Sequence, residues 1–85
     1  MYYVYILQSE SFPSNYYTGL TSDLKDRFAR HNRGEVGSTN RYTPWKIVFY
    51  GAFPNREQAS KFEIYLKSGS GRAFVSRHLI DKQID

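Results

Sequence analysis

Residues 16–31 read YYTGLTSDLKDRFARH, and the rest of the chain is organised around this stretch. The aromatic and β-branched residues over 16–20 predict a short strand. Because strand side chains alternate, Tyr17 and Gly19 are expected on the same side of it. A glycine inside a strand weakens the strand and usually marks the close approach of another group. We therefore expect a second side chain to lie against Gly19.

The second half of the stretch predicts a helix that runs to about Arg33, with a glycine at position 34 as its C-terminal stop. The candidate N-caps are Thr21, Ser22 and Asp23. At about 100° per residue, Leu24 and Phe28 form the inward stripe. Arg27 and His31, four residues apart, lie at the edge of that stripe. Both side chains are therefore expected to point towards the protein body.

Two more strands complete the expected sheet. Residues 2–8 are apolar on both faces, which predicts a central strand that is covered on both sides. Residues 45–53 form the third strand. Its expected core face carries Trp45, Ile47 and Phe49. Between the second and third strands, residues 35–44 are polar and lack periodicity, so they predict a long loop.

Two helices follow the third strand. Asn55 and Gln58 predict a capping box at the start of the first, whose apolar stripe is Ala59, Phe62 and Leu66. A break is expected over 68–71, and a last amphipathic piece over 73–80. The order strand, strand, helix, strand, helix, helix predicts an α+β fold with helices packed on a three-stranded antiparallel sheet. At 85 residues, the chain is expected to form one domain, 1–85.

The charge is unevenly distributed along the chain. The net charge is +4, yet residues 1–24 hold no Lys or Arg, and all twelve lie between Lys25 and Lys82. A basic region with interleaved aromatic residues favours a polyanionic partner, most simply nucleic acid. Charge that serves only solubility is an equally good explanation of the same pattern.

Several classes of protein do not fit this composition. The chain has no cysteine, which excludes disulfides and thiolate metal sites and fits a reducing compartment. No apolar run approaches ~18 residues, and the start of the chain lacks the charged segment of a signal peptide. We therefore expect a cytoplasmic protein without a membrane partner.

A few side chains are candidates for chemistry, each with an ordinary structural alternative. Tyr5 and Tyr17 stand on neighbouring strands and can share a face, although most strand tyrosines are core residues. The planar guanidinium of Arg27 suits a phosphate, but its stem can also simply cover apolar surface. His31 alone would more often be structural, but it points the same way as Arg27.

Glu63 is the most informative of the candidates. A carboxylate beside an apolar stripe is uncommon unless it is paired or bound to a cation. Lys67 lies four residues later, at the favourable spacing for a helical ion pair. Such a pair contributes only about 0.3–0.5 kcal/mol when exposed, so it neither explains nor excludes a functional role for Glu63.

The ordered set of these residues resembles the GIY-YIG nuclease domain, most closely its small stand-alone bacterial members. Residues 3–5 (Tyr-Val-Tyr) stand where that family has Gly-Ile-Tyr, and residues 17–19 (Tyr-Thr-Gly) stand where it has Tyr-Ile-Gly. The helix with Arg27 and His31, and then Glu63, follow in the family's order. The match covers residues 2 to about 72. The first motif departs from the family because Tyr3 replaces its glycine.

The resemblance implies a three-stranded antiparallel sheet flanked by helices and a metal-dependent DNA endonuclease that hydrolyses phosphodiester bonds. It implies that Glu63 holds one divalent ion, Mg²⁺ or Mn²⁺, and that Arg27 stabilises charge on the scissile phosphate. Tyr17, with Tyr5 nearby, would activate or orient the attacking water. His31 would assist proton transfer or hold a tyrosine.

The resemblance also implies DNA as the partner, with no small-molecule cofactor. The residues expected to contact DNA are Asn40, Arg41, Lys67 and Arg72. The resemblance fits best an enzyme of DNA repair or recombination that is directed by DNA structure or by the DNA backbone. Whether a protein partner supplies specificity is left open by the sequence. The alternative is a non-catalytic nucleic-acid-binding module of the same fold.

Overall fold

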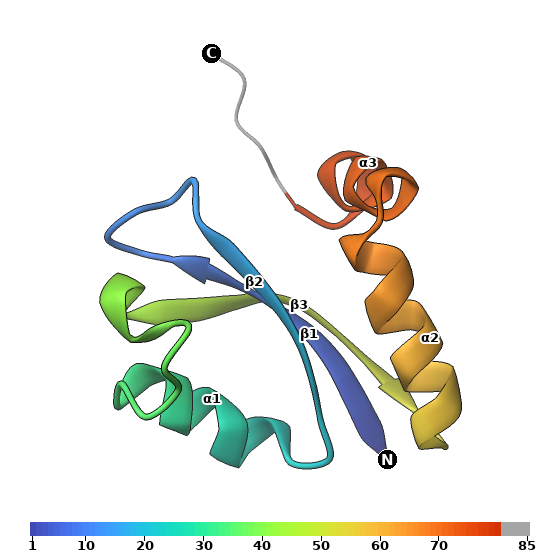
Figure 1. The fold of residues 1–85 in the computed structure, drawn as a ribbon, viewed down its shortest axis with the longest axis horizontal. Coiled ribbons are helices and arrows are strands. Elements are labelled where there is room, and N and C mark those ends of the chain that lie inside the picture. Colours follow the sequence, from blue (N-terminus) through green and yellow to red (C-terminus); the bar gives the residue numbers. More distant parts are fainter. Residues whose placement is uncertain (81–85) are drawn as a thin grey trace.

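The computed structural model describes residues 1–80, so the last five residues of the expected domain lie outside the described part. The strands are β1 (Tyr2–Ser9), β2 (Tyr16–Thr21) and β3 (Trp45–Phe53). The helices are α1 (Leu24–Asn32), α2 (Arg56–Lys67) and α3 (Gly69–His78), together with one turn of 3₁₀ helix, η1 (Asn40–Tyr42). Figure 1 shows α1 on one side of the sheet and α2 and α3 on the other. The predicted fold class is confirmed.

β1 is the central strand, as its two apolar faces predicted. The sheet order is β2-β1-β3, and β1 pairs antiparallel with both neighbours. Val4 and Ile6 pack with α2 in one buried cluster, whereas Tyr5 and Leu7 pack in a second cluster that α1 covers. Alternate residues of β1 therefore face different layers, and Tyr5 belongs to the α1 side.

β3 departs from the regular alternation that the sequence predicted. Ile6 pairs with Phe49 and Leu7 with Ile47, so Val48 is an extra residue in a β-bulge. Trp45 and Ile47 belong to the cluster under α1, but Phe49 packs in the cluster under α2. The prediction that these three share a face was wrong, because one inserted residue inverts the pattern beyond it.

The junction of α2 and α3 is shorter than expected. Ser68 alone separates the two helices, and its hydroxyl donates to Tyr65 O at 2.6 Å and accepts from Gly71 N at 3.1 Å. Gly71 lies so close to the Tyr65 carbonyl that a Cβ at position 71 would overlap it. The predicted break is confirmed, because α2 ends at Lys67, but it spans Ser68 alone, and α3 begins at Gly69 instead of near residue 73.

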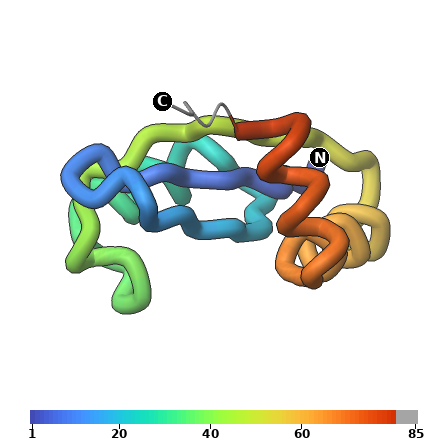
Figure 2. Tube along the Cα trace, turned by 90° about the horizontal axis from the view of Figure 1, so that it is seen from above, coloured from blue at the N-terminus to red at the C-terminus, as the bar shows by residue number. Residues whose placement is uncertain are grey.

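The other helix boundaries follow the predicted caps. Asp23 accepts a hydrogen bond from Asp26 N at 3.1 Å, and Asn55 accepts one from Gln58 N at 2.9 Å. Figure 2 shows the segment around η1 (green) at one end of the molecule and α2 and α3 (yellow to red) at the other. Within residues 1–80, no helix combines the length and apolar character needed to cross a membrane.

Candidate active site

A buried chain of hydrogen bonds runs from β1 through α1 to the loop before η1. The Tyr5 hydroxyl lies 2.8 Å from His31 Nε2, and His31 Nδ1 lies 2.8 Å from Thr39 Oγ1. Each of these three residues is at most 1% exposed. The expectation that His31 points towards the protein body is confirmed, and its side chain is completely buried.

The sequence did not predict that Thr39 takes part in these hydrogen bonds. It lies in the polar segment 35–44, whose lack of periodicity gave no reason to expect a buried side chain. Its backbone carbonyl accepts from Trp45 Nε1 at 3.0 Å, and its hydroxyl is 3.3 Å from Val36 O. The segment is thus anchored to the core at Thr39, although its neighbours Asn40 and Arg41 are exposed.

The imidazole of His31 is neutral at physiological pH. Burial, and then the charge of Arg27, lower the pKa of His31 from 6.5 to about 4. A neutral imidazole has one donor and one acceptor nitrogen. A carbonyl can only accept, so the Thr39 hydroxyl donates to Val36 O and is left to accept from His31 Nδ1. This arrangement favours Nε2 as the acceptor of the Tyr5 hydroxyl proton.

Tyr5 is a protonated phenol in the same environment. Burial raises the pKa of the Tyr5 phenol above its usual value, and the Arg27 guanidinium opposes the rise. Tyr17 and Glu63 also raise the pKa of Tyr5, by smaller amounts, so the charge of Glu63 acts on this hydroxyl. The Tyr5 phenol, in turn, raises the pKa of Arg27, which stays charged. The cluster therefore holds a neutral Tyr5 phenol beside a charged Arg27 guanidinium.

Gly19 lets the two tyrosines meet. It pairs with Tyr5 across β1 and β2, and a Cβ at position 19 would overlap the Tyr5 ring. The Tyr17 ring lies 6.3 Å from the Tyr5 ring and 5.0 Å from the His31 ring, measured between centroids. The side chain expected against Gly19 is therefore Tyr5, and the absence of a Cβ opens the space that its phenol fills.

Glu63 approaches this cluster from α2. Its side chain is only 19% exposed, and its Oε2 is 3.3 Å from Lys67 Nζ. Within residues 1–80, no three His, Cys, Asp or Glu side chains are close enough to form a metal cage. A cation at Glu63 would thus have one protein carboxylate and otherwise water or substrate oxygens. Mg²⁺ fits this donor set because it retains waters and binds through one or two carboxylates and phosphate.

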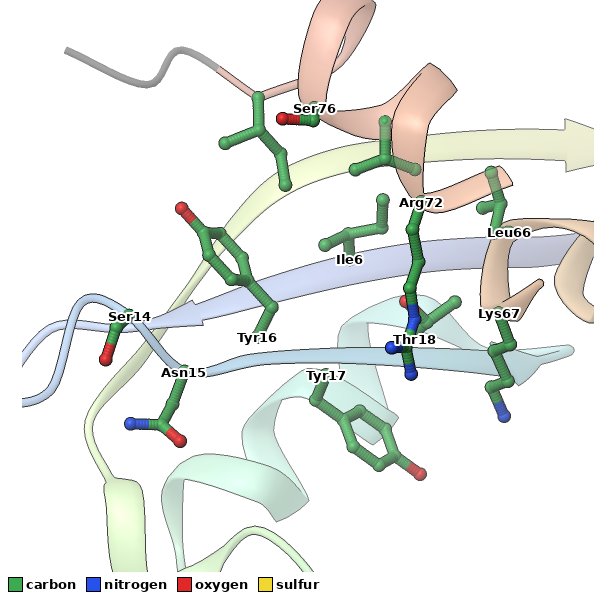
Figure 3. A pocket seen from close by; sticks show the side chains of 12 residues that line it. Ile6, Ser14, Asn15, Tyr16, Tyr17, Thr18, Leu66, Lys67, Arg72 and Ser76 are labelled. Atoms are coloured by element: carbon green, nitrogen blue, oxygen red, sulfur yellow. The ribbon is translucent and has the colours of Figure 1, made fainter. Parts of the chain in front are cut away.

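The residues expected to contact DNA fall into two groups on either side of the cluster. Lys67 and Arg72 line a groove between β2 and α3 that also reaches Tyr17 (Figure 3). Asn40 and Arg41 are exposed on η1, next to Thr39. The structure brings Tyr5, Tyr17, Arg27 and His31 together, with Glu63 close by. The four expected DNA contacts surround this cluster without belonging to it.

The chain is similar to known proteins along most of its length. The family model for the GIY-YIG catalytic domain matches residues 1–75. A UPF0213 protein of Streptococcus pyogenes serotype M3 is 34% identical over 95% of this chain and 91% of its own length, and one of serotype M1 has the same values.

A solved structure is similar as well. The solution NMR structure of the UPF0213 protein BH0048 from Bacillus halodurans covers 93% of this chain and 87% of its own, with 32% sequence identity and a TM-score of 0.55. These matches span most of the chain and include the strands and helices that carry the cluster. The chain belongs to the GIY-YIG family.

Proposed function

We propose that this protein is a metal-dependent endonuclease that hydrolyses phosphodiester bonds in DNA. The family is generally one of endonucleases. The observation that supports the proposal best is the Tyr5 hydroxyl, held 2.8 Å from a neutral His31 beside the charged Arg27. Such a site combines an oriented oxygen with a phosphate-binding cation, which are two requirements of phosphodiester hydrolysis.

His31 would orient Tyr5 rather than remove its proton. Burial raises the pKa of the Tyr5 phenol and lowers that of His31 to about 4, and both shifts oppose transfer of the phenol proton to Nε2. The Tyr5 proton would stay directed at Nε2, and the buried phenol would hold Arg27 in place through the interaction that raises the pKa of Arg27. Tyr17, whose ring is adjacent and only partly buried, would orient the attacking water.

Arg27 would bind the scissile phosphate. Its guanidinium stays charged, and its planar fork matches two phosphate oxygens. The negative charge that develops on the phosphate during attack would be stabilised by this cation. Because His31 is neutral, Arg27 would be the principal cationic side chain of the cluster itself.

Glu63 would hold the divalent ion, Mg²⁺ or Mn²⁺, which when bound supplies Lewis-acid stabilisation of phosphate oxygens. One oxygen of the Glu63 carboxylate is paired with Lys67, so the ammonium and a bound ion would compete for the carboxylate. Lys67 is about half exposed and its long side chain can turn to solvent or to a DNA phosphate. Lys67 would then pair with a DNA phosphate instead of the Glu63 carboxylate.

The proposed setting is the cytoplasm, and the proposed role is in DNA repair or recombination, where the protein would recognise DNA structure or the DNA backbone. A protein partner would supply specificity that one small domain lacks. The alternative is a non-catalytic nucleic-acid-binding module of the same fold, in which the Lys67–Glu63 pair would only stabilise the helix.

A cleavage assay tests this proposal. The wild-type protein is incubated with Mg²⁺ or Mn²⁺ and single-stranded, duplex, flap and branched DNA. We expect Glu63→Gln and Arg27→Gln to lower the cleavage rate about 100-fold or more. Glu57→Gln is a matched control because it removes the equivalent carboxylate of a second i,i+4 pair, Glu57–Lys61, on the same helix.

Arg30→Gln is the control for Arg27, because Arg30 lies on the exposed face of α1 beside Asp26. Both controls should cleave at the wild-type rate. Cleavage by Glu63→Gln at that rate would contradict the proposed role of the carboxylate. Salt-dependent binding without cleavage of any substrate would leave the binding module as the better description.

A further inference from the structure

A groove of about 640 Å³ lies between the edge strand β2 and helix α3. Its floor is apolar and is formed by Ile6, Leu66, Val75 and Ile80. Tyr16 forms one wall, and its hydroxyl accepts a hydrogen bond from Gln8 Nε2 at 3.1 Å. Figure 3 shows Tyr16 and Tyr17 pointing to opposite sides of β2. The groove is therefore separate from the buried cluster but shares a strand with it.

Among the described residues that line the groove, the charged side chains have one sign. They are Lys67 and Arg72. Figure 3 shows both side chains extending from the helices towards the edge of β2. The groove thus offers an apolar and aromatic interior with a cationic rim. This combination suits a ligand that has a flat apolar part and an anionic part.

The groove and the candidate active site lie on opposite faces of the sheet but are linked at two residues (Figure 3). Tyr17 lines the groove and its ring lies against the Tyr5–His31 pair, and Lys67 is paired with Glu63. A phosphate held by Lys67 and Arg72 would place the base attached to it over the groove.

We propose that this groove binds one unpaired nucleotide of a nucleic-acid strand. Its base would pack against Tyr16 and the apolar floor, and its phosphate would contact Arg72 and Lys67. The proposal rests on the proposed function and implies that the DNA bound by the protein is single-stranded or has an extruded nucleotide. A base stacked inside a duplex does not expose its face, so duplex DNA would not fill the groove.

Binding is measured with the full chain carrying Glu63→Gln, which prevents cleavage. The probe is an oligonucleotide with the fluorescent base 2-aminopurine, offered as a single strand and, separately, inside a duplex. We expect Tyr16→Leu to weaken single-strand binding about 5- to 150-fold, which corresponds to the ~1–3 kcal/mol of one base–aromatic stack. Duplex binding should not change. Tyr50→Leu, an exposed tyrosine of β3 outside this groove, is the control.

Arg72→Gln tests the rim without disturbing the core, since Arg72 is exposed. It should weaken single-strand binding and reduce the slope of log affinity against log salt by about 0.7. Arg77→Gln, also exposed on α3 but not lining the groove, should keep the wild-type slope. Circular dichroism establishes that each variant is folded.

The proposal is overturned if Tyr16→Leu and Arg72→Gln, both folded, bind the single strand as well as their controls do. Its failure can be distinguished from failure of the endonuclease proposal. If the wild type cleaves DNA but the two groove variants bind the single strand as well as their controls do, only the groove proposal is contradicted. If both groove variants lose single-strand binding and the wild type cleaves no substrate, the groove proposal is supported and the endonuclease proposal is contradicted.

Discussion

The Tyr5 hydroxyl and His31 Nε2 are 2.8 Å apart, although the two residues are 26 positions apart in the sequence and come from different layers of the fold. The pair sits in the core, where solvent does not compete for the hydrogen bond. The Thr39 hydroxyl on the other ring nitrogen determines which nitrogen is free to accept. The chemistry proposed for Tyr5 thus depends on a residue from a loop.

The stability of the protein should fall between pH 6.5 and pH 4 because of His31. The unfolded chain binds a proton near pH 6.5, whereas the folded chain resists it until about pH 4. The unfolded state therefore holds more protons in this window, and the free energy of unfolding decreases as the pH falls. The stability that burial of neutral His31 confers is complete above pH 6.5. Its loss amounts to about 3 kcal/mol at pH 4.

Denaturant titrations from pH 4 to pH 7.5 measure this effect. Carboxylates also titrate in part of the range, so the informative quantity is the difference between wild type and His31→Gln. That difference should shrink as the pH falls below 6.5. His78→Gln is the control, because His78 is exposed at the end of α3. An unchanged difference over the whole range would show that His31 titrates normally in the folded state.

Thr39→Val should leave the Nδ1 hydrogen of His31 without a partner inside the core. A buried donor without an acceptor costs about 1–3 kcal/mol, so the free energy of unfolding should fall by that amount. Thr39→Ser keeps the hydroxyl and should lose less than about 1.5 kcal/mol, mainly from the missing methyl group. Nitrogen-15 NMR of the imidazole reports the tautomer directly. We expect the proton on Nδ1 in wild type and Thr39→Ser, and an equal loss of stability in both variants would contradict the assigned role.

Gly19→Ala should force the Tyr5 ring away from His31. The added Cβ overlaps the ring, and overpacking of a core typically costs about 1–3 kcal/mol. Thermal unfolding measures the loss of stability. Gly37→Ala is the matched change for stability, because nothing lies within 4 Å of a Cβ at that position. If the two alanine variants unfold at the same temperature, Gly19 is not needed for the approach of Tyr5.

Removal of the Lys67 ammonium should strengthen ion binding at Glu63 in the absence of DNA. An exposed ion pair is worth about 0.2–1 kcal/mol, so Lys67→Gln should lower the dissociation constant for Mn²⁺ by about 1.5- to 5-fold. Calorimetry or electron paramagnetic resonance of Mn²⁺ measures this change. Lys61→Gln, which frees Glu57 on the solvent face of α2, should not change it. Weaker Mn²⁺ binding in Lys67→Gln would mean that the ion does not compete with Lys67.

The parts of the fold that were predicted correctly depend on neighbours in the sequence. The caps at Asp23 and Asn55 need only a side chain three residues before a free backbone N–H group. The central position of β1 follows from its two apolar faces. These signals act within one or two turns of chain, so they can be read without knowledge of the partners.

The parts that were missed depend on contacts between distant segments. Val48 becomes a bulge only because β3 pairs with β1, and Gly71 joins α3 only because that helix crosses α2 closely. Thr39 is buried because His31 and Trp45 bind it, which no periodicity in residues 35–44 encodes. In each case the decisive partner comes from another element.

The sequence by itself determined the order of the elements, the strand faces up to the bulge and the residues that carry the family motifs. Only the tertiary structure decided that His31 is buried and neutral, that Thr39 orients it and that Glu63 comes within electrostatic reach of Tyr5. The physical reason is that hydrophobic periodicity specifies which face of an element is covered. The pKa of a side chain and its hydrogen-bond partners depend instead on the groups that cover it.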